Sequence, residues 1–202
     1  MKKTSYFLVL LISFIGFAQE NYQVQIGQQS IPVELDKTYT IELDGKSYNL
    51  KFVENEKFTY QAEDISFKHP KGYNPNKVQL EAGIEQIVLM TAEGAGFIIQ
   101  KYESIDPSMM KELMLNEVTK ESKNYGFSES REDYTRTLKD GTKINIIRSV
   151  LNYKNEINIY EIASISKRDE GFLLMTMQMD DNPNSAGKKL IKTIWDSIQF
   201  YK

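Results

Sequence analysis

One predicted strand in the second half of the chain is apolar on both faces, and this feature constrains the fold more than any other. Alternate side chains of an extended strand point to opposite faces of a sheet. Ile144, Ile146 and Val150 therefore share one face, while Ile147 and Leu151 share the other. A half-solvated sheet has apolar residues on one face only, so this pattern predicts a sheet covered on both sides.

Turn residues divide the surrounding sequence into strands. Asp140-Gly141, Lys154-Asn155 and Asp169-Glu170-Gly171 are typical of tight turns between antiparallel strands. The sequence thus predicts an antiparallel meander, with strands over about 130–138, 142–152, 156–167 and 172–179.

Two helices are expected to cover this sheet. Asp106 suits an N-cap, Pro107 the first helical position and Gly126 the C-terminal end, which predicts a helix over 107–124. Its residues at helical spacing are Met110, Leu113, Met114, Glu117 and Val118. A second helix is expected to begin at Asn184 or Ser185. Its apolar stripe consists of Leu190, Ile191, Ile194, Trp195 and Ile198.

The first half of the chain is predicted to form short strands. Val24 and Ile26 alternate with glutamines before the pattern breaks over 27–30, and a hairpin is expected around Asp44-Gly45-Lys46. Further strands are expected over 57–61, 64–68, 85–92 and 96–102, with regular structure interrupted over 69–75 by Pro, Gly and Asn.

These elements predict an α+β protein, specifically an α/β/α sandwich. Its sheet is mostly antiparallel, with one central and one C-terminal helix and an N-terminal β-hairpin. The 202 residues suffice for one domain and a small appendage, and 41% hydrophobic with 26% charged residues is typical of a globular chain.

The first 18 residues have the pattern of a secretory signal peptide. Lys2 and Lys3 precede an apolar run of 11 residues from Phe7 to Phe17, with Gly16 and Ala18 at the positions before a cleavage site. The run is shorter than the about 20 residues that a transmembrane helix needs. The segment resembles Bacteroidota signal peptides. We therefore expect a periplasmic or secreted protein that begins at Gln19 and has no stable membrane anchor.

Cysteine and charge limit the possible functions. The chain has no Cys, which excludes disulfides, thiolate metal sites and Cys nucleophiles. Removing residues 1–18 takes two lysines away and changes the formal net charge from −3 to −5. Such an acidic protein is not expected to bind nucleic acid.

The stretch from Ile65 to Tyr73, Ile-Ser-Phe-Lys-His-Pro-Lys-Gly-Tyr, resembles the opening motif of the PsbP-like and DcrB-like families. The order that follows is similar as well, and the resemblance covers about 58–202. It implies an α/β/α sandwich that serves as a non-catalytic binding or assembly module, although Tyr73 stands where a Trp is common. The chain then divides into a signal peptide at 1–18, an N-terminal β-hairpin extension at 19–57 and the sandwich domain at 58–202.

Few residues are candidates for catalysis or ligand binding. His69 is the only His, beside Pro70, and we expect it in a turn or on the surface rather than in a catalytic triad. The glycines of Gly94-Ala95-Gly96 are expected in a hairpin turn. The acidic pairs Asp169-Glu170 and Asp180-Asp181 could hold a hard cation, but their places beside turns favour a structural role. No catalytic, cofactor or metal site is therefore assigned.

Three methionines form the most distinctive local pattern. Met175, Met177 and Met179 alternate along one strand, which places their thioethers on one face with Leu173. Thioethers bind Cu(I), but Met also fills gaps in apolar cores, and a sheet covered on both faces favours the core.

Three functions remain. The sequence favours an exported non-catalytic binding or assembly module of the cell envelope, with an unidentified envelope protein as partner. The alternative is a periplasmic Cu(I)-handling protein that uses the Met face. A hydrolase is the third, because two carboxylates suffice for hydrolysis without a local motif.

Overall fold

The computed structural model describes residues 22–26, 28–43 and 45–201. They belong to two compact units, Met1–Glu54 and Asn55–Lys202, each of which is described by itself. The signal peptide predicted at 1–18 lies outside the described residues.

The first unit contains two antiparallel hairpins rather than the single hairpin predicted. Strand β1 (Tyr22–Ile26) pairs with β2 (Gln29–Val33), and β3 (Thr38–Leu43) pairs with β4 (Lys46–Lys51). Strand β2 was not expected, because the alternation breaks over 27–30, and it also contains Pro32. The Pro is tolerated here because β2 lies at the edge of a two-stranded sheet. Val33 is the buried residue of this strand, with 5% of its surface exposed.

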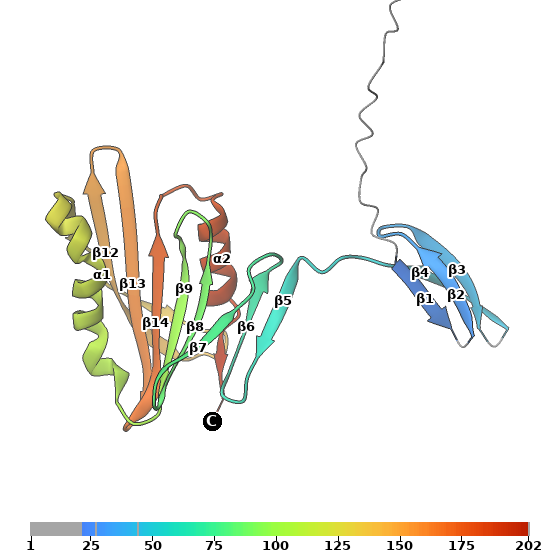
Figure 1. Cartoon of the computed structure of the whole chain (residues 1–202), viewed down its shortest axis with the longest axis horizontal. Coiled ribbons are helices and arrows are strands. Elements are labelled where there is room, and N and C mark those ends of the chain that lie inside the picture. Colours follow the sequence, from blue (N-terminus) through green and yellow to red (C-terminus); the bar gives the residue numbers. More distant parts are fainter. Residues whose placement is uncertain (1–21, 27, 44, 202) are drawn as a thin grey trace, which may run out of the picture. The chain divides into compact units, whose positions relative to one another are not determined.

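The second unit is built on an eight-stranded antiparallel sheet (Figure 1). The strand order is β10-β12-β13-β14-β9-β8-β7, and β11 also pairs with β12. The bounds are β7 Asn76–Glu81, β8 Ile84–Met90, β9 Gly96–Tyr102, β10 Ser128–Arg131, β11 Tyr134–Thr137, β12 Lys143–Tyr153, β13 Glu156–Lys167 and β14 Glu170–Gln178. The predicted meander is confirmed as β12-β13-β14.

One helix lies on each side of this sheet, as Figure 1 shows. Helix α1 (Lys111–Tyr125) packs on β12 and β13, whereas α2 (Ala186–Trp195) packs on β9 and β14. The α+β sandwich expected from the sequence is thereby confirmed.

The two faces of the sheet carry separate apolar cores. The core on the α2 side contains Ile144 and Ile146, and the core on the α1 side contains Ile147 and Leu151, as alternation predicts. The predicted stripe of the C-terminal helix is confirmed in the α2-side core: Leu190, Ile191, Ile194, Trp195 and Ile198 are all buried.

A three-stranded sheet completes the α2 side. Its order is β15-β6-β5, with bounds β15 Gln199–Phe200, β6 Ile65–Pro70 and β5 Lys57–Gln61. Helix α2 contacts β6, so this sheet and the large sheet share one core. Strand β6 extends through His69 and Pro70, where an interruption was predicted. Pro70 is tolerated because β15 pairs only with Ile65 and Ser66, so the other end of β6 lies at an edge of the sheet.

The predicted strand 130–138 is divided into β10 and β11. At the break, the Glu132 amide bonds the Arg148 carbonyl at 2.9 Å, and the Asp133 carboxylate accepts the Arg148 amide at 2.9 Å. The Asp133 carboxylate thus takes the place of a backbone carbonyl as acceptor for the Arg148 amide, and β10 ends at this point. Strand β7 was also not predicted, because Asn76, Lys77 and Gln79 dilute its apolar pattern.

The predicted helix 107–124 begins as a 3-10 turn, η1 (Pro107–Met110), before α1. The Asp106 side chain accepts the Ser108 amide at 2.8 Å, and Gly126 adopts a left-handed φ of 113° at the end of α1, so both predicted caps are confirmed. Leu113 was expected on the buried face, but it is 62% exposed; Leu115 is the leucine in the core.

Candidate functional site

The principal candidate site is an apolar hollow of about 490 Å³ on the α2 side of the second unit. Its apolar walls are Ile165 of β13, Phe172 of β14 and Phe200 of β15, and we call it the aromatic hollow. The rings of Phe172 and Phe200 lie 4.9 Å apart between centroids, in a tilted arrangement. The other lining residues are Asp64, Lys101, Tyr102, Asp140, Thr142, Ser166, Lys167, Glu170, Gly171 and Tyr201.

An ion pair lies at the rim of the aromatic hollow. Lys101 Nζ is 2.6 Å from an oxygen of Asp64, and this hydrogen bond raises the pKa of Lys101 despite its partial burial. Tyr201 lies on the same side, where its hydroxyl is 2.6 Å from Ser66 Oγ and its amide bonds the Asp64 carbonyl at 2.9 Å. The rim therefore presents a fixed cation, a fixed anion and a half-exposed tyrosine ring.

Backbone geometry shapes the floor of the hollow. Gly171 is the second residue of β14 and lies opposite Ser166 of β13. A Cβ at Gly171 would lie 2.2 Å from the Ile165 carbonyl oxygen, so the two strands approach closely only because this residue is Gly. The close approach places Ile165 beside Phe172 in the wall.

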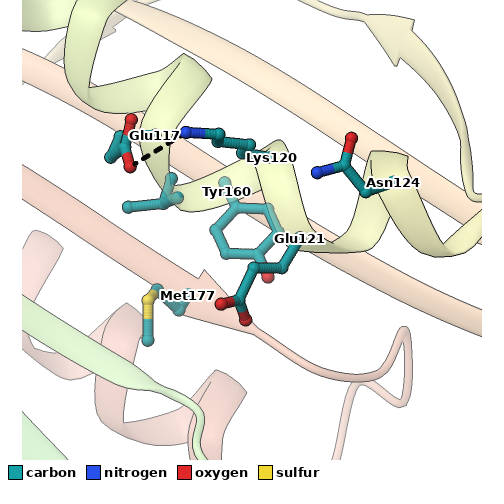
Figure 2. A pocket seen from close by; sticks show the side chains of 7 residues that line it. Glu117, Lys120, Glu121, Asn124, Tyr160 and Met177 are labelled. Atoms are coloured by element: carbon teal, nitrogen blue, oxygen red, sulfur yellow. Dashed lines mark ion pairs between the residues drawn. The ribbon is translucent and has the colours of Figure 1, made fainter.

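A second hollow, of about 530 Å³, lies beside α1 (Figure 2). Its lining residues are Glu117, Val118, Lys120, Glu121, Asn124, Tyr160 and Met177. Lys120 forms a long ion pair of 3.8 Å with Glu117, and both side chains are more than 60% exposed. Water screens such exposed pairs strongly, so this hollow offers little fixed charge to a ligand.

The methionines named from the sequence lie on the face of β14 toward α1, together with Leu173. Met175 is buried, with 5% of its surface exposed, and Met177 and Met179 are partly buried against the same core. Figure 2 shows Met177 below Tyr160 and to the left of Glu121, at the second hollow. These contacts place Met175 among apolar side chains, where its thioether fills space.

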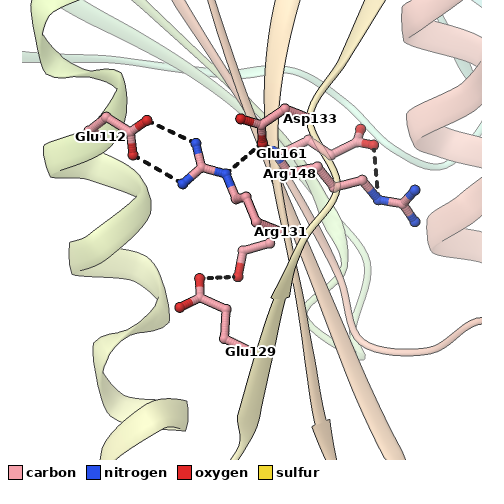
Figure 3. Close-up of polar contacts among 7 residues, drawn as sticks. Glu112, Glu129, Arg131, Asp133, Arg148 and Glu161 are labelled. Carbon is pink, nitrogen blue, oxygen red and sulfur yellow. Dashed lines mark hydrogen bonds and ion pairs between the residues drawn. The ribbon is translucent and has the colours of Figure 1, made fainter.

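A polar cluster joins α1 to β10 (Figure 3). Arg131 donates two hydrogen bonds to the Glu112 carboxylate, at 2.8 and 3.2 Å, and a third to Asp133 at 2.5 Å. This pairing lowers the pKa of Glu112 and raises that of Arg131. Glu129 accepts from Ser149 Oγ at 2.6 Å and from Lys123 at 3.2 Å. Each charged side chain of this cluster is paired with another member of the cluster, which indicates a structural role.

Glu161 is the centre of a second polar cluster, on the α2 side. It accepts the Tyr134 hydroxyl at 2.9 Å and the Thr176 hydroxyl at 3.3 Å, and Arg148 Nε lies 3.7 Å away. Burial, and secondarily the Glu161 charge, raises the pKa of Tyr134 to about 12. The phenol therefore remains protonated at neutral pH and acts as a hydrogen-bond donor that holds Glu161.

His69 does not lie in a turn or on the surface, so that prediction was wrong. It is 5% exposed within β6, where its ring stacks on Phe58 at 6.1 Å. The strand continues through this residue, and alternation directs the imidazole to the same side as Phe67.

The remaining candidates have structural roles among the described residues, except Glu170, which belongs to the candidate site. Gly94 adopts a left-handed φ of 84° in the β8–β9 turn, which confirms the predicted hairpin. Asp180 accepts the Asn182 amide at 2.8 Å, and Glu170 lines the aromatic hollow. Within 22–26, 28–43 and 45–201, no three His, Cys, Asp or Glu side chains converge as a metal site. The helices of this part of the chain are all too short or too polar to cross a bilayer.

Sequence reasoning missed the aromatic hollow. Its walls come from segments far apart in the chain, from Asp64 of the β5–β6 loop to Tyr201 after β15. The one local signal was Phe200, an apolar residue beyond the end of the C-terminal helix.

The fold and this hollow define the chain as an α+β sandwich protein with a surface site of ligand-binding size. No family model and no curated protein matches the chain. Among solved structures it is similar to the cyanobacterial PsbP protein, CyanoP, of Synechocystis sp. PCC 6803, with 13% identity, a TM-score of 0.47 and coverage of 72% of this chain and 93% of that chain. The likeness is one of fold alone, and membership of the PsbP-like family stays a prediction.

Proposed function

We propose that the protein is an exported, non-catalytic binding module of the cell envelope that holds a partner protein at the aromatic hollow. The observation that carries this proposal is the apolar wall of Ile165, Phe172 and Phe200 beside the Lys101–Asp64 ion pair. Binding sites commonly combine an apolar cavity of several hundred Å³ with a few fixed polar groups. An aromatic or aliphatic side chain of the partner fits such a site.

The charged clusters elsewhere support a binding role rather than a catalytic one. Glu112, Arg131 and Asp133 bond one another, and Glu161 is held by Tyr134, Thr176 and Arg148. The hydrogen bonds from Arg131 lower the pKa of Glu112, so this carboxylate stays ionised and is not poised to move a proton.

Export is the part of the proposal that rests on the sequence. Lys2, Lys3, the apolar run and Ala18 support cleavage before Gln19. Mass spectrometry of the envelope fraction is expected to detect an N-terminus at Gln19. Recovery of the chain with residues 1–18 intact in the cytoplasm contradicts export, while leaving the hollow itself open to test.

Affinity capture from an envelope extract tests the binding role. Replacing Phe200 with Ala removes one wall of the hollow, and we expect the captured partner to be lost. Lys101→Met breaks the rim ion pair while preserving most of the side-chain stem, and it should weaken capture. The matched control is Tyr125→Ala, which removes a ring that is 69% exposed on α1. Unfolding curves show whether each variant is folded. Equal capture by folded Phe200→Ala and wild type contradicts the proposal.

A further inference from the structure

The aromatic hollow carries more negative than positive charge. Its charged lining residues are three carboxylates and two ammonium groups: Asp64, Asp140, Glu170, Lys101 and Lys167. Lys101 and Asp64 form the rim ion pair at 2.6 Å, so their charges offset each other. Lys167 lies directly opposite Glu170 in the β13–β14 register, where opposite charges also offset each other. The carboxylate of Asp140 is left without a compensating charge.

Asp140 lies in the turn between β11 and β12, at the edge of the hollow. Its Oδ1 accepts the Thr142 amide at 2.9 Å, and it forms no ion pair with a residue of the described ranges. Lys139 and Lys143 flank it in the sequence, but neither lines the hollow. Lys143 precedes Ile144 of the α2-side core, so its side chain points to the other face of the sheet. Asp140 therefore gives the hollow a net negative charge.

The surroundings of Lys101 have the same sign. The hydrogen bond to Asp64 raises the pKa of Lys101, and the charges of Asp64, Glu103 and Glu85 raise it further. Glu85 is itself paired with Lys77 at 2.6 Å, whereas Glu103 is exposed. Negative charge thus predominates at this end of the sheet, which favours a cation over an anion in the hollow.

The apolar walls also suit a basic side chain. The face of an aromatic ring attracts a cation, and the walls include Phe172, Phe200 and the half-exposed ring of Tyr201. Arginine and lysine pack their long apolar stems on apolar surface while the charged head stays at the water boundary. A hollow with aromatic walls and a carboxylate at its edge offers a place to both parts of such a side chain.

We propose that the hollow takes a basic side chain of the partner protein, whose stem packs against Phe172 and Phe200 and whose charged head pairs with Asp140. This inference rests on the proposed function and adds to it the chemistry of the partner, a segment in which a basic residue adjoins an apolar one. An acidic segment is disfavoured, because its carboxylate would meet the carboxylate of Asp140.

Two blocked dipeptides test which charge the hollow prefers. Acetyl-phenylalanyl-arginine amide and acetyl-phenylalanyl-glutamate amide share the ring and differ in charge, and NMR titration of the full exported protein measures their affinities. At low ionic strength we expect the arginine probe to bind at least about threefold more tightly, the size of effect that an exposed ion pair gives. The ratio should approach one in about 1 M salt, which screens exposed charges. Equal affinities at low salt, or no binding of either probe, overturn the inference.

The matched variants are Asp140→Asn and Asp181→Asn. Asn at position 140 keeps a side-chain oxygen for the Thr142 amide and suits a tight turn before Gly141, so the fold should be preserved. Asp181 follows the opposite end of β14 from the hollow, and its replacement removes the same charge there. The preference for the arginine probe should disappear in Asp140→Asn and persist in Asp181→Asn. The same result in both variants overturns the inference.

Capture of the cellular partner separates this inference from the proposed function. Lys101→Met releases Asp64 from its place at the rim, so it changes geometry as well as charge, whereas Asp140→Asn changes the charge alone. We expect folded Asp140→Asn to capture less partner than wild type at low ionic strength. Loss of capture in Phe200→Ala with full capture by Asp140→Asn would leave the binding role standing and overturn the basic side chain. Full capture by both folded variants would overturn both.

Discussion

Gly187 marks the closest approach between α2 and the β8–β9 turn. A Cβ at this position would lie 2.3 Å from Ala95 Cβ, well inside van der Waals contact. The helix therefore reaches its place on the sheet because residue 187 has no side chain.

The first prediction concerns this contact. Gly→Ala inside a helix normally stabilises a protein by up to about 1 kcal/mol. We expect Gly187→Ala to destabilise this one by about 1 to 3 kcal/mol, because the added methyl overpacks the contact. Urea unfolding measures the change. Adding Ala95→Gly should restore stability, and failure of that rescue would show that the contact is not the cause.

The second prediction uses the pKa of Tyr134, which burial raises to about 12 from the ordinary tyrosine value of 10.0. The folded state holds the phenol proton more tightly than the unfolded state, so this contribution to stability is complete below pH 10 and is lost as pH rises toward 12. Tyr134→Phe has no such proton. The free energy of unfolding should fall less steeply between pH 10 and 12 in Tyr134→Phe than in wild type; identical slopes would contradict the raised pKa.

At the scale of elements, α1 offers a matched pair of leucines. Leu115 is 1% exposed in the α1-side core, whereas Leu113 is 62% exposed on the outer surface. We expect Leu115→Ala to lower the free energy of unfolding by about 2 to 5 kcal/mol. Leu113→Ala should change it by no more than about 0.5 kcal/mol. Equal effects, measured by urea unfolding, would mean that α1 packs through a different face.

The methionines of β14 give the fourth prediction. Met177→Leu nearly conserves volume, so if the thioether only fills space the variant should lose less than about 1.5 kcal/mol. On that account, titration of the purified protein with Cu(I) should show no stoichiometric uptake. Tight uptake by wild type that disappears in Met177→Leu would favour the copper alternative instead.

The long elements could be predicted from the sequence because their signals are local. The turns Asp140-Gly141 and Lys154-Asn155 separate strands of strong periodicity, and Asp106 and Gly126 are caps at the ends of one helix. Strand β7 and the break after Arg131 could not be predicted, because the first depends on pairing with β8 and the second on the Arg148 backbone. Leu113 was misplaced because its spacing fits either of two adjacent helix faces.

At the scale of the whole molecule, the candidate site escaped sequence analysis for a physical reason. Asp64, Lys101, Phe172 and Phe200 meet only after β15 pairs with β6 and β9 pairs with β14. No spacing along the chain records contacts of such long range. The covering of both sheet faces, in contrast, was evident in β12, because burial on both sides places apolar residues at both odd and even positions of the strand.

The central claim is that the aromatic hollow is the surface that binds a partner. The most direct measurement is site-specific photo-crosslinking in intact cells, with a photoreactive amino acid in place of Tyr201, which is 44% exposed at the rim, or of Leu113 on α1 as the control. The account predicts a discrete adduct from position 201 and none from position 113. No adduct from position 201, or the same adduct from both positions, would contradict it.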